Sequence, residues 1–123
     1  MRLLICGDRN GGFEEEIEHL LTKKAGEIKL LITGACRGVD LCAEGLARTL
    51  EIPYVGVPAR WGELGKRAGP LRNQEMLDRY KPTRVVGFHK SINWSRGTKD
   101  MLTRSKRGRV DAWLFDGEKW SRW

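Results

Sequence analysis

Short apolar runs alternate with segments of helical periodicity along the whole chain of 123 residues. Uninterrupted apolar runs are typical of strands that are buried on both faces, as in parallel sheets. Alternation of such strands with helices predicts a parallel sheet with helices packed on both faces. The chain is therefore predicted to form one doubly wound α/β domain with about five mostly parallel strands. The predicted strands cover residues 2–6, 28–33, 52–58, 83–88 and 110–115.

Four helices are expected between these strands, because apolar residues recur there at spacings of three and four. In the first helix these residues are Phe13, Ile17 and Leu21, and Gly26 ends the helix. Pro70 is expected at the first position of the third helix, where its missing N–H breaks no helical hydrogen bond. The other helices are predicted at 40–50 and 97–106, and the loops at 7–12, 34–38, 59–68 and 89–96.

Length and composition are those of one small globular domain. The domain is predicted to span residues 1–116, and residues 117–123 are expected to form a short, loosely held tail. No apolar run approaches the roughly 20 residues of a membrane-spanning helix. The run that begins near Met1 stops at Gly7, which is too early for a signal peptide. We therefore expect a cytoplasmic protein without a membrane partner.

The net charge of +7 is concentrated in the second half of the chain. Residues 59–123 contain 16 Lys and Arg against 7 Asp and Glu, whereas residues 1–58 are slightly acidic. Such an excess favours an anionic partner, although basic side chains on helices also serve solubility alone. Binding to DNA or RNA therefore remains open. The basic tail with Trp120 and Trp123 is suited to stacking on single strands or to docking on a partner subunit.

The three cysteines, Cys6, Cys36 and Cys42, show neither the spacing of a zinc site nor that of a disulfide framework. We expect Cys6 and Cys42 to be packed in the core. Cys36 lies in a loop just before a predicted helix, where the helix dipole would stabilise a thiolate. No His or other base is adjacent to it in sequence, and no metal site is predicted.

Three segments combine small residues with a cation or a hydroxyl where a loop enters a predicted helix. They are Thr33–Asp40, Ala68–Asn73 and Ser95–Thr98. A helix N-terminus presents free backbone N–H groups and the positive end of the helix dipole, and both favour an anion. In open parallel sheets, ligands bind outside the carboxyl ends of the strands, and the loops that contain Asp8, Gly34 and Ser95 follow strands. These segments therefore predict one pocket for a phosphate-bearing ligand.

Four motifs in a fixed order make the chain resemble the YspA-like branch of the SLOG superfamily. They are Cys-Gly-Asp-Arg at 6–9, Thr-Gly-Ala-Cys-Arg-Gly-Val-Asp at 33–40, Ala-Gly-Pro-Leu-Arg-Asn-Gln-Glu-Met at 68–76 and Ser-Arg-Gly-Thr-Lys-Asp-Met at 95–101. The resemblance covers residues 1–116. SLOG domains are Rossmann-like, and they are related to the DNA-processing protein DprA and to the LOG phosphoribohydrolases.

The resemblance implies a Rossmann-like domain that binds a nucleotide or a nucleotide-derived small molecule. The residues that would hold the phosphate of this ligand are Gly34, Arg37, Gly38, Gly97 and Thr98. The resemblance also implies a homo-oligomer that acts as a ligand sensor or as a nucleotide-processing enzyme in conflicts between bacteria and phages. No cofactor besides the ligand is expected from the sequence, with Mg²⁺ only where a nucleotide brings it.

The chain departs from the LOG enzymes at the position of their catalytic glutamate. Those enzymes carry Pro-Gly-Gly before Gly-Thr and a Glu three residues after the Thr, whereas this chain has Met101 there. Asp100 lies about 100° away around a helix and is not expected to replace the glutamate. We therefore expect a sensor or sequestering module, with an enzyme that cleaves an N-glycosidic bond as the alternative.

A wider set of residues is expected around the ligand. For the enzyme alternative, the acid–base candidates are Asp8, Asp40 and His89. Trp61 and Trp94 lie in loops near the same edge, where they either stack on a base or cover the rim of the core. The predicted ligand-binding residues are Gly7, Asp8, Arg9, Gly34, Ala35, Cys36, Arg37, Gly38, Asp40, Arg72, Asn73, Ser95, Arg96, Gly97 and Thr98.

Overall fold

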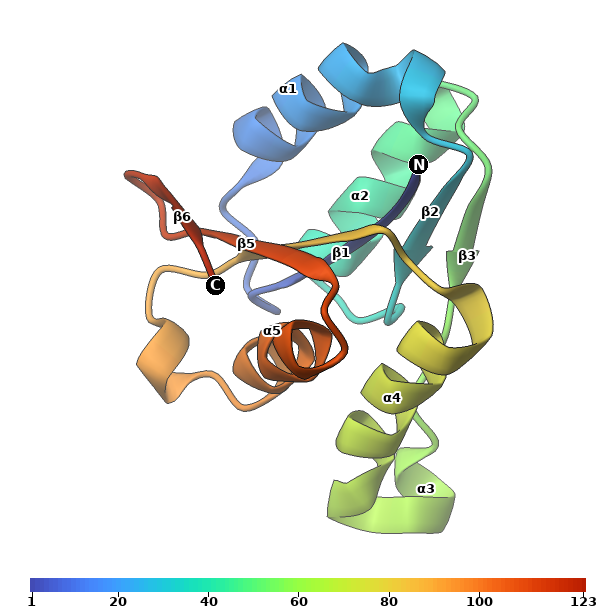
Figure 1. Cartoon of the computed structure of the whole chain (residues 1–123), viewed down its shortest axis with the longest axis vertical. Coiled ribbons are helices and arrows are strands. Elements are labelled where there is room, and N and C mark those ends of the chain that lie inside the picture. The colour runs from blue at the N-terminus through green and yellow to red at the C-terminus, as the bar shows by residue number, and fades with distance from the viewer.

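A six-stranded sheet forms the centre of the computed structural model, which describes residues 1–123 (Figure 1). The strands lie in the order β3-β2-β1-β4-β5-β6; β1 to β5 are parallel, and β6 is antiparallel to β5. Their bounds are β1 Arg2–Gly7, β2 Leu30–Thr33, β3 Tyr54–Gly56, β4 Arg84–Phe88, β5 Asp111–Phe115 and β6 Trp120–Arg122. The predicted Rossmann-like, doubly wound α/β architecture is confirmed.

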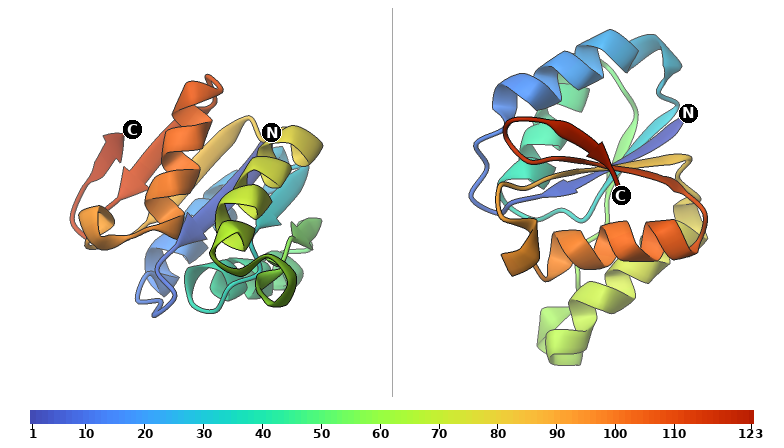
Figure 2. Two further views of the ribbon diagram at one scale, coloured as in Figure 1. Left: turned by 90° about the horizontal axis from the view of Figure 1, so that it is seen from below. Right: turned by 60° about the vertical axis from the view of Figure 1, so that its left-hand side comes forward.

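Helices cover both faces of this sheet (Figure 2). The helices α1 (Glu14–Lys24) and α2 (Val39–Thr49) pack on one face, and α4 (Ala68–Tyr80) and α5 (Gly97–Arg107) pack on the other. A short α3 (Trp61–Leu64) precedes α4, and 3₁₀ turns form η1 (Ala25–Glu27), η2 (Gly65–Arg67) and η3 (Ile92–Trp94). None of the helices combines the length and the apolar character that crossing a membrane requires.

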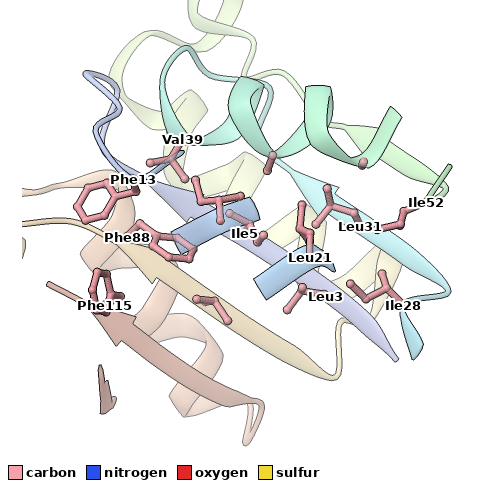
Figure 3. Close-up of a cluster of buried hydrophobic side chains, with 14 residues drawn as sticks. Leu3, Ile5, Phe13, Leu21, Ile28, Leu31, Val39, Ile52, Phe88 and Phe115 are labelled. Carbon is pink, nitrogen blue, oxygen red and sulfur yellow. The ribbon is translucent and has the colours of Figure 1, made fainter. Parts of the chain in front are cut away.

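Side chains that alternate along β1 supply the two halves of the core, because successive strand residues point to opposite faces of a sheet. Leu3 and Ile5 join the cluster beneath α1 and α2, which Figure 3 draws. Leu4 and Cys6 join the cluster beneath α4 and α5. Cys6 is thus a core residue as predicted, and burial raises the pKa of its thiol. Cys42 is half-buried and packs against the first cluster.

The segment predicted as a loop at 59–68 contains helical turns. It holds α3 and η2, and α4 begins at Ala68, two residues before the predicted start at Pro70. Pro70 is tolerated at the third helical position, since the first N–H groups of a helix have no intrahelical acceptor. The strand β3 is shorter than predicted because Pro53 and Pro58 flank it and cannot donate ladder hydrogen bonds.

The prediction of a loosely held tail at 117–123 is wrong, because this segment folds back as β6 along β5. The side chain of Asp116 fixes the reversal by accepting two hydrogen bonds of 2.9 Å from backbone amides of the turn. Trp120 then packs against Phe88 and Phe115, with ring centroids 5.7 and 5.1 Å apart. Tertiary aromatic packing therefore holds a segment that looks like a free end in the sequence.

Replacing Trp120 by alanine is expected to destabilise the fold by about 1–2 kcal/mol, because two aromatic contacts and their buried area are lost. Urea unfolding followed by circular dichroism measures the change. The control is Ser121→Ala on the same strand, since the side chain of Ser121 is exposed. An unchanged unfolding midpoint for W120A would mean that this packing does not hold the segment.

Candidate functional site

The carboxyl ends of β1 and β4 border a cavity of about 500 Å³. The strand order changes direction between these two strands, and doubly wound sheets bind ligands at such a switch point. The loop after β2 and the starts of α2, α4 and α5 complete the wall, with α3 at the rim. Twelve of the fifteen predicted ligand-binding residues line this cavity, as does His89; the exceptions are Ala35, Arg37 and Gly38.

Arg72 of α4 lies at the floor of this cavity with 8% of its surface exposed. Its Nη1 donates to the carbonyl oxygens of Gly34 at 2.5 Å and Val57 at 3.2 Å, and its Nε donates to Oδ1 of Asn73 at 3.1 Å. The nearest partner of Nη2 is the sulfur of Cys36, at 3.9 Å. The guanidinium makes no salt bridge. Arg72 therefore ties the ends of β2 and β3 to α4 and leaves a positive charge at the floor.

Asp40, in the first turn of α2, is the buried anion of the same floor, with 4% of its surface exposed. Its Oδ2 accepts hydrogen bonds from the backbone N–H groups of Gly34 at 3.0 Å and Cys36 at 3.3 Å, whereas its Oδ1 accepts none. Burial raises the pKa of Asp40 to about 6, against the opposing effects of these two amides and of Arg72. Two amides of the loop after β2, residues 34–38, which we call the glycine loop, are thus already bonded to a carboxylate of the protein.

Asn73 extends this network from α4 to α5. Its Nδ2 donates to the carbonyl oxygen of Gly97 at 3.3 Å and to Oδ2 of Asp100 at 3.0 Å. Arg104 donates to the same oxygen at 2.8 Å in a salt bridge along α5. The charge of Asp100, which lines the cavity, is therefore compensated by Arg104, and the start of α5 is fixed to α4.

Two of the glycines predicted to hold phosphate have contacts inside the protein. A Cβ at Gly34 would lie 2.6 Å from Nη1 of Arg72, so only glycine lets the guanidinium approach. A Cβ at Gly38 would overlap the carbonyl oxygen of Asp8, and the φ of +81° at Gly38 also favours glycine. Gly97 has no atom within 4 Å of its Cβ position. Among these three glycines, Gly97 borders open space.

The start of α5 directs the positive end of its helix dipole to the cavity, because its first residues line the wall. Ser95 precedes the helix, and its Oγ accepts a hydrogen bond from the amide of Thr98 at 3.0 Å. Thr98 is buried, whereas Arg96 and Gly97 are exposed. This junction therefore brings an exposed cation, an exposed glycine and the positive end of a helix dipole to one wall of the cavity.

Three exposed cations stand on the rim, and none of them forms a salt bridge. They are Arg9 after β1, Lys66 of η2 and Arg96 before α5. The guanidinium carbon of Arg9 lies 5.5 Å from the centroid of the Trp61 ring. The far edge of this ring rests on Gly69, where a Cβ would lie 3.0 Å away. The mouth of the cavity is therefore basic and has one aromatic wall.

Part of the lining was not in the predicted set. It comprises Cys6, Lys66, Gly69, Pro70, Met76 and Asp100, together with Trp61, for which the sequence allows stacking on a base or covering the rim of the core. Gly69 and Pro70 belong to the Ala-Gly-Pro motif, so that motif was an available signal. Asp100 reaches the cavity because α5 turns Met101 into the core, where it is fully buried. No sequence signal marks Lys66, which lies in a segment expected to be a plain loop.

Other predicted residues lie outside the cavity or are bonded within the protein. Arg37 is exposed on the loop after β2, beyond the cavity. Trp94 is 89% exposed and does not line the cavity. His89 lines it, but its Nδ1 accepts a hydrogen bond from the amide of Ser91 at 3.0 Å. No group of His, Cys, Asp and Glu side chains is arranged to hold a metal ion.

Comparison with known proteins found no matching family model, no similar curated protein and no similar solved structure. The resemblance to SLOG domains therefore rests on the four sequence motifs. Because doubly wound folds carry many unrelated functions, the fold alone does not identify a ligand. The basis for a functional assignment is thus the chemistry of the cavity.

Asp40→Asn is expected to fold and to be at least as stable as the wild type at neutral pH. The amide oxygen of asparagine can accept both loop hydrogen bonds that now reach Oδ2, and the cost of burying a carboxylate disappears. The pKa of Asp40 is raised from 3.8 to about 6. This shift corresponds to a loss of about 3 kcal/mol in the free energy of unfolding of the wild type at pH values above about 6. The folded wild type binds its proton more tightly than the unfolded chain, so this group lowers stability as the pH rises from about 4 to about 6.

Thermal unfolding of both proteins across this pH range measures the difference, which should vanish at the acidic end. The control is Asp78→Asn, because Asp78 is exposed on α4 and does not line the cavity. A D40N protein that is less stable than the wild type at neutral pH would show that the ionised carboxylate stabilises the loop.

Proposed function

We propose that the cavity binds a nucleotide or a nucleotide-derived small molecule and holds it by its phosphate. The observation that carries this proposal is the basic lining. The rim cations Arg9, Lys66 and Arg96 have no ion pair, and the guanidinium of Arg72 is buried beneath them without one. Cations in such surroundings are stabilised by a bound anion, and arginine in particular matches the oxygens of a phosphate.

The start of α5 offers the best position for the phosphate. Gly97 borders open space there, and the helix dipole adds to the charge of Arg96. Thr98 contributes a hydroxyl to the same wall. The glycine loop after β2 is a poorer position, because Asp40 already accepts hydrogen bonds from two of its amides.

The remainder of the cavity suits a larger group than phosphate. Its volume of about 500 Å³ lies within the range of about 300–1,000 Å³ that small-molecule sites occupy. Trp61 supplies an aromatic surface at the rim, positioned by Gly69 and Arg9. A basic end and an aromatic wall in one cavity fit a phosphate joined to a planar base.

A sensor or sequestering role is the function that we propose, in keeping with the resemblance to SLOG domains. Met101, at the position of the LOG glutamate, is buried in the core and presents no acid to the cavity. Asp100 does line the cavity, but its Oδ2 is bonded to Asn73 and Arg104. Met101 has no carboxylate, and the carboxylate of Asp100 is paired with Arg104, so neither side chain matches the glutamate of the LOG enzymes.

Cleavage of an N-glycosidic bond is a second candidate, which one observation favours. The pKa of Asp40, raised to about 6 by burial, suits an acid–base group that works near neutral pH. Incubation with nucleoside 5′-monophosphates and chromatography of the free base tests this candidate. Release of base by the wild type but not by D40N is the expected signature of the enzyme, and absence of release after long incubation would exclude it.

The binding proposal predicts that the double variant Lys66→Glu/Arg96→Glu binds nucleotides at least about tenfold more weakly, because two attractive charges at the mouth become repulsive. Titration calorimetry with nucleoside mono- and diphosphates, cyclic nucleotides and ADP-ribose measures this effect. The control is Lys106→Glu/Arg107→Glu, which changes the net charge equally at the far end of α5 and should bind like the wild type.

Equal weakening in both double variants would indicate attraction to the overall charge rather than to the cavity. A wild-type protein that binds none of these nucleotides would overturn the proposal.

A further inference from the structure

One carboxylate oxygen in the floor of the cavity has no hydrogen-bond partner within the protein. It is Oδ1 of Asp40, since both loop amides donate to Oδ2. No fully buried side-chain oxygen or nitrogen in the chain lacks a partner, so Oδ1 must be accessible. Asp40 is 4% exposed and lines the cavity. The small accessible part of this side chain therefore faces the cavity.

The guanidinium of Arg72 lies in the same floor as this carboxylate, and both residues line the cavity. A Cβ at Gly34 would lie 2.6 Å from Nη1 of Arg72 and 3.1 Å from Oδ2 of Asp40, so both side chains converge on the same glycine. They nevertheless form no salt bridge with each other. Nη2 carries two hydrogens, and its contact is with the sulfur of Cys36, a weak acceptor, at 3.9 Å. The floor thus offers one strong acceptor, Oδ1 of Asp40, and one donor, Nη2 of Arg72, whose only partner is a weak acceptor.

A hydroxyl group fits this pair with a single atom, whereas a phosphate or a lone N–H group does not. A phosphate would be repelled by the carboxylate, and an N–H group could donate to Asp40 but could not accept from Arg72. A hydroxyl both donates and accepts. We propose that Asp40 and Arg72 bind a sugar hydroxyl of the ligand, so that the cavity selects ribose-containing phosphates over those that lack this hydroxyl. This inference rests on the proposed function and deepens it.

The subsites for the phosphate and for the hydroxyl are fixed relative to each other by one side chain. Asn73 accepts a hydrogen bond from Arg72 in the floor and donates one to the carbonyl oxygen of Gly97 at the start of α5. The two subsites are therefore neighbours in a rigid frame. A ribose 5′-phosphate carries a phosphate and hydroxyl groups on one small sugar, so it is the kind of ligand that we propose for the two subsites.

Titration calorimetry with AMP, 2′-deoxy-AMP and 3′-deoxy-AMP tests the inference, with the guanine, cytosine and uracil counterparts covering base preference. The wild type is expected to bind the ribonucleotide about 10- to 100-fold more tightly than at least one deoxy analogue, the usual effect of losing a hydrogen bond to a charged group. D40N should bind both forms equally, with the affinity of that analogue. Asp78→Asn is the matched control and should keep the wild-type preference, and thermal unfolding verifies that both variants are folded.

Each other outcome overturns the inference in a recognisable way. Equal binding of the ribonucleotide and both deoxy analogues by the wild type would refute the hydroxyl site and leave the proposed function intact. A second outcome is that D40N binds more weakly while the wild type does not discriminate among the sugars. Oδ1 of Asp40 would then accept a hydrogen bond from an N–H group of the ligand, and the hydroxyl site would be refuted. Tighter binding by D40N would place the phosphate at the floor. No binding of any nucleotide by the wild type would instead be the failure of the proposed function.

Discussion

The buried guanidinium of Arg72 is the interaction on which the cavity depends. It donates to backbone carbonyl oxygens of Gly34 and Val57, which follow β2 and β3, and to the side chain of Asn73. Carbonyl groups at the ends of parallel strands need partners when they are buried, and an unsatisfied one costs about 1–3 kcal/mol. A lysine could not replace this side chain, because Nη1 serves Gly34 and Val57 while Nε, two bonds along the side chain, serves Asn73, and a lysine has no second nitrogen at the position of Nε. The edge of the sheet and the start of α4 are thus joined by a single planar group.

The same interaction explains why the floor carries two buried charges that do not neutralise each other by direct contact. Arg72 directs its hydrogens to the backbone, and Asp40 directs one oxygen to the loop amides. Burial of a charge without a salt bridge lowers stability, and here it raises the pKa of Asp40 to about 6. Buried charges that lower stability are characteristic of binding and catalytic sites, where they also interact with a ligand.

The sequence predicted the fold more completely than it predicted the site. Apolar runs and helical spacing depend on local order along the chain, so they revealed the five parallel strands and the main helices. The strand β6 escaped prediction, because it is held by the contact of Trp120 with Phe88 and Phe115, which only the folded sheet brings together. The motifs located the wall of the cavity, but they did not separate residues that border open space, such as Gly97, from residues that support the wall. Gly34 is an example: the sequence predicts it as a ligand contact, whereas in the structure the absence of a side chain at Gly34 makes room for the guanidinium of Arg72.

This distinction changes where an anion can bind. The resemblance to SLOG domains pointed to the glycine loop after β2 as one phosphate contact. In this chain Asp40 accepts hydrogen bonds from two amides of that loop. A phosphate that took over these amides would place a second anion beside the buried carboxylate of Asp40. The start of α5 has no such competitor, because Gly97 borders open space and Arg96 lies on the rim without an ion pair. The loop is also ordered by the protein's own hydrogen bonds, so a ligand would meet a formed wall and would lose little free energy in ordering it. We therefore expect affinity to come from the rim and the start of α5, and selectivity from the floor.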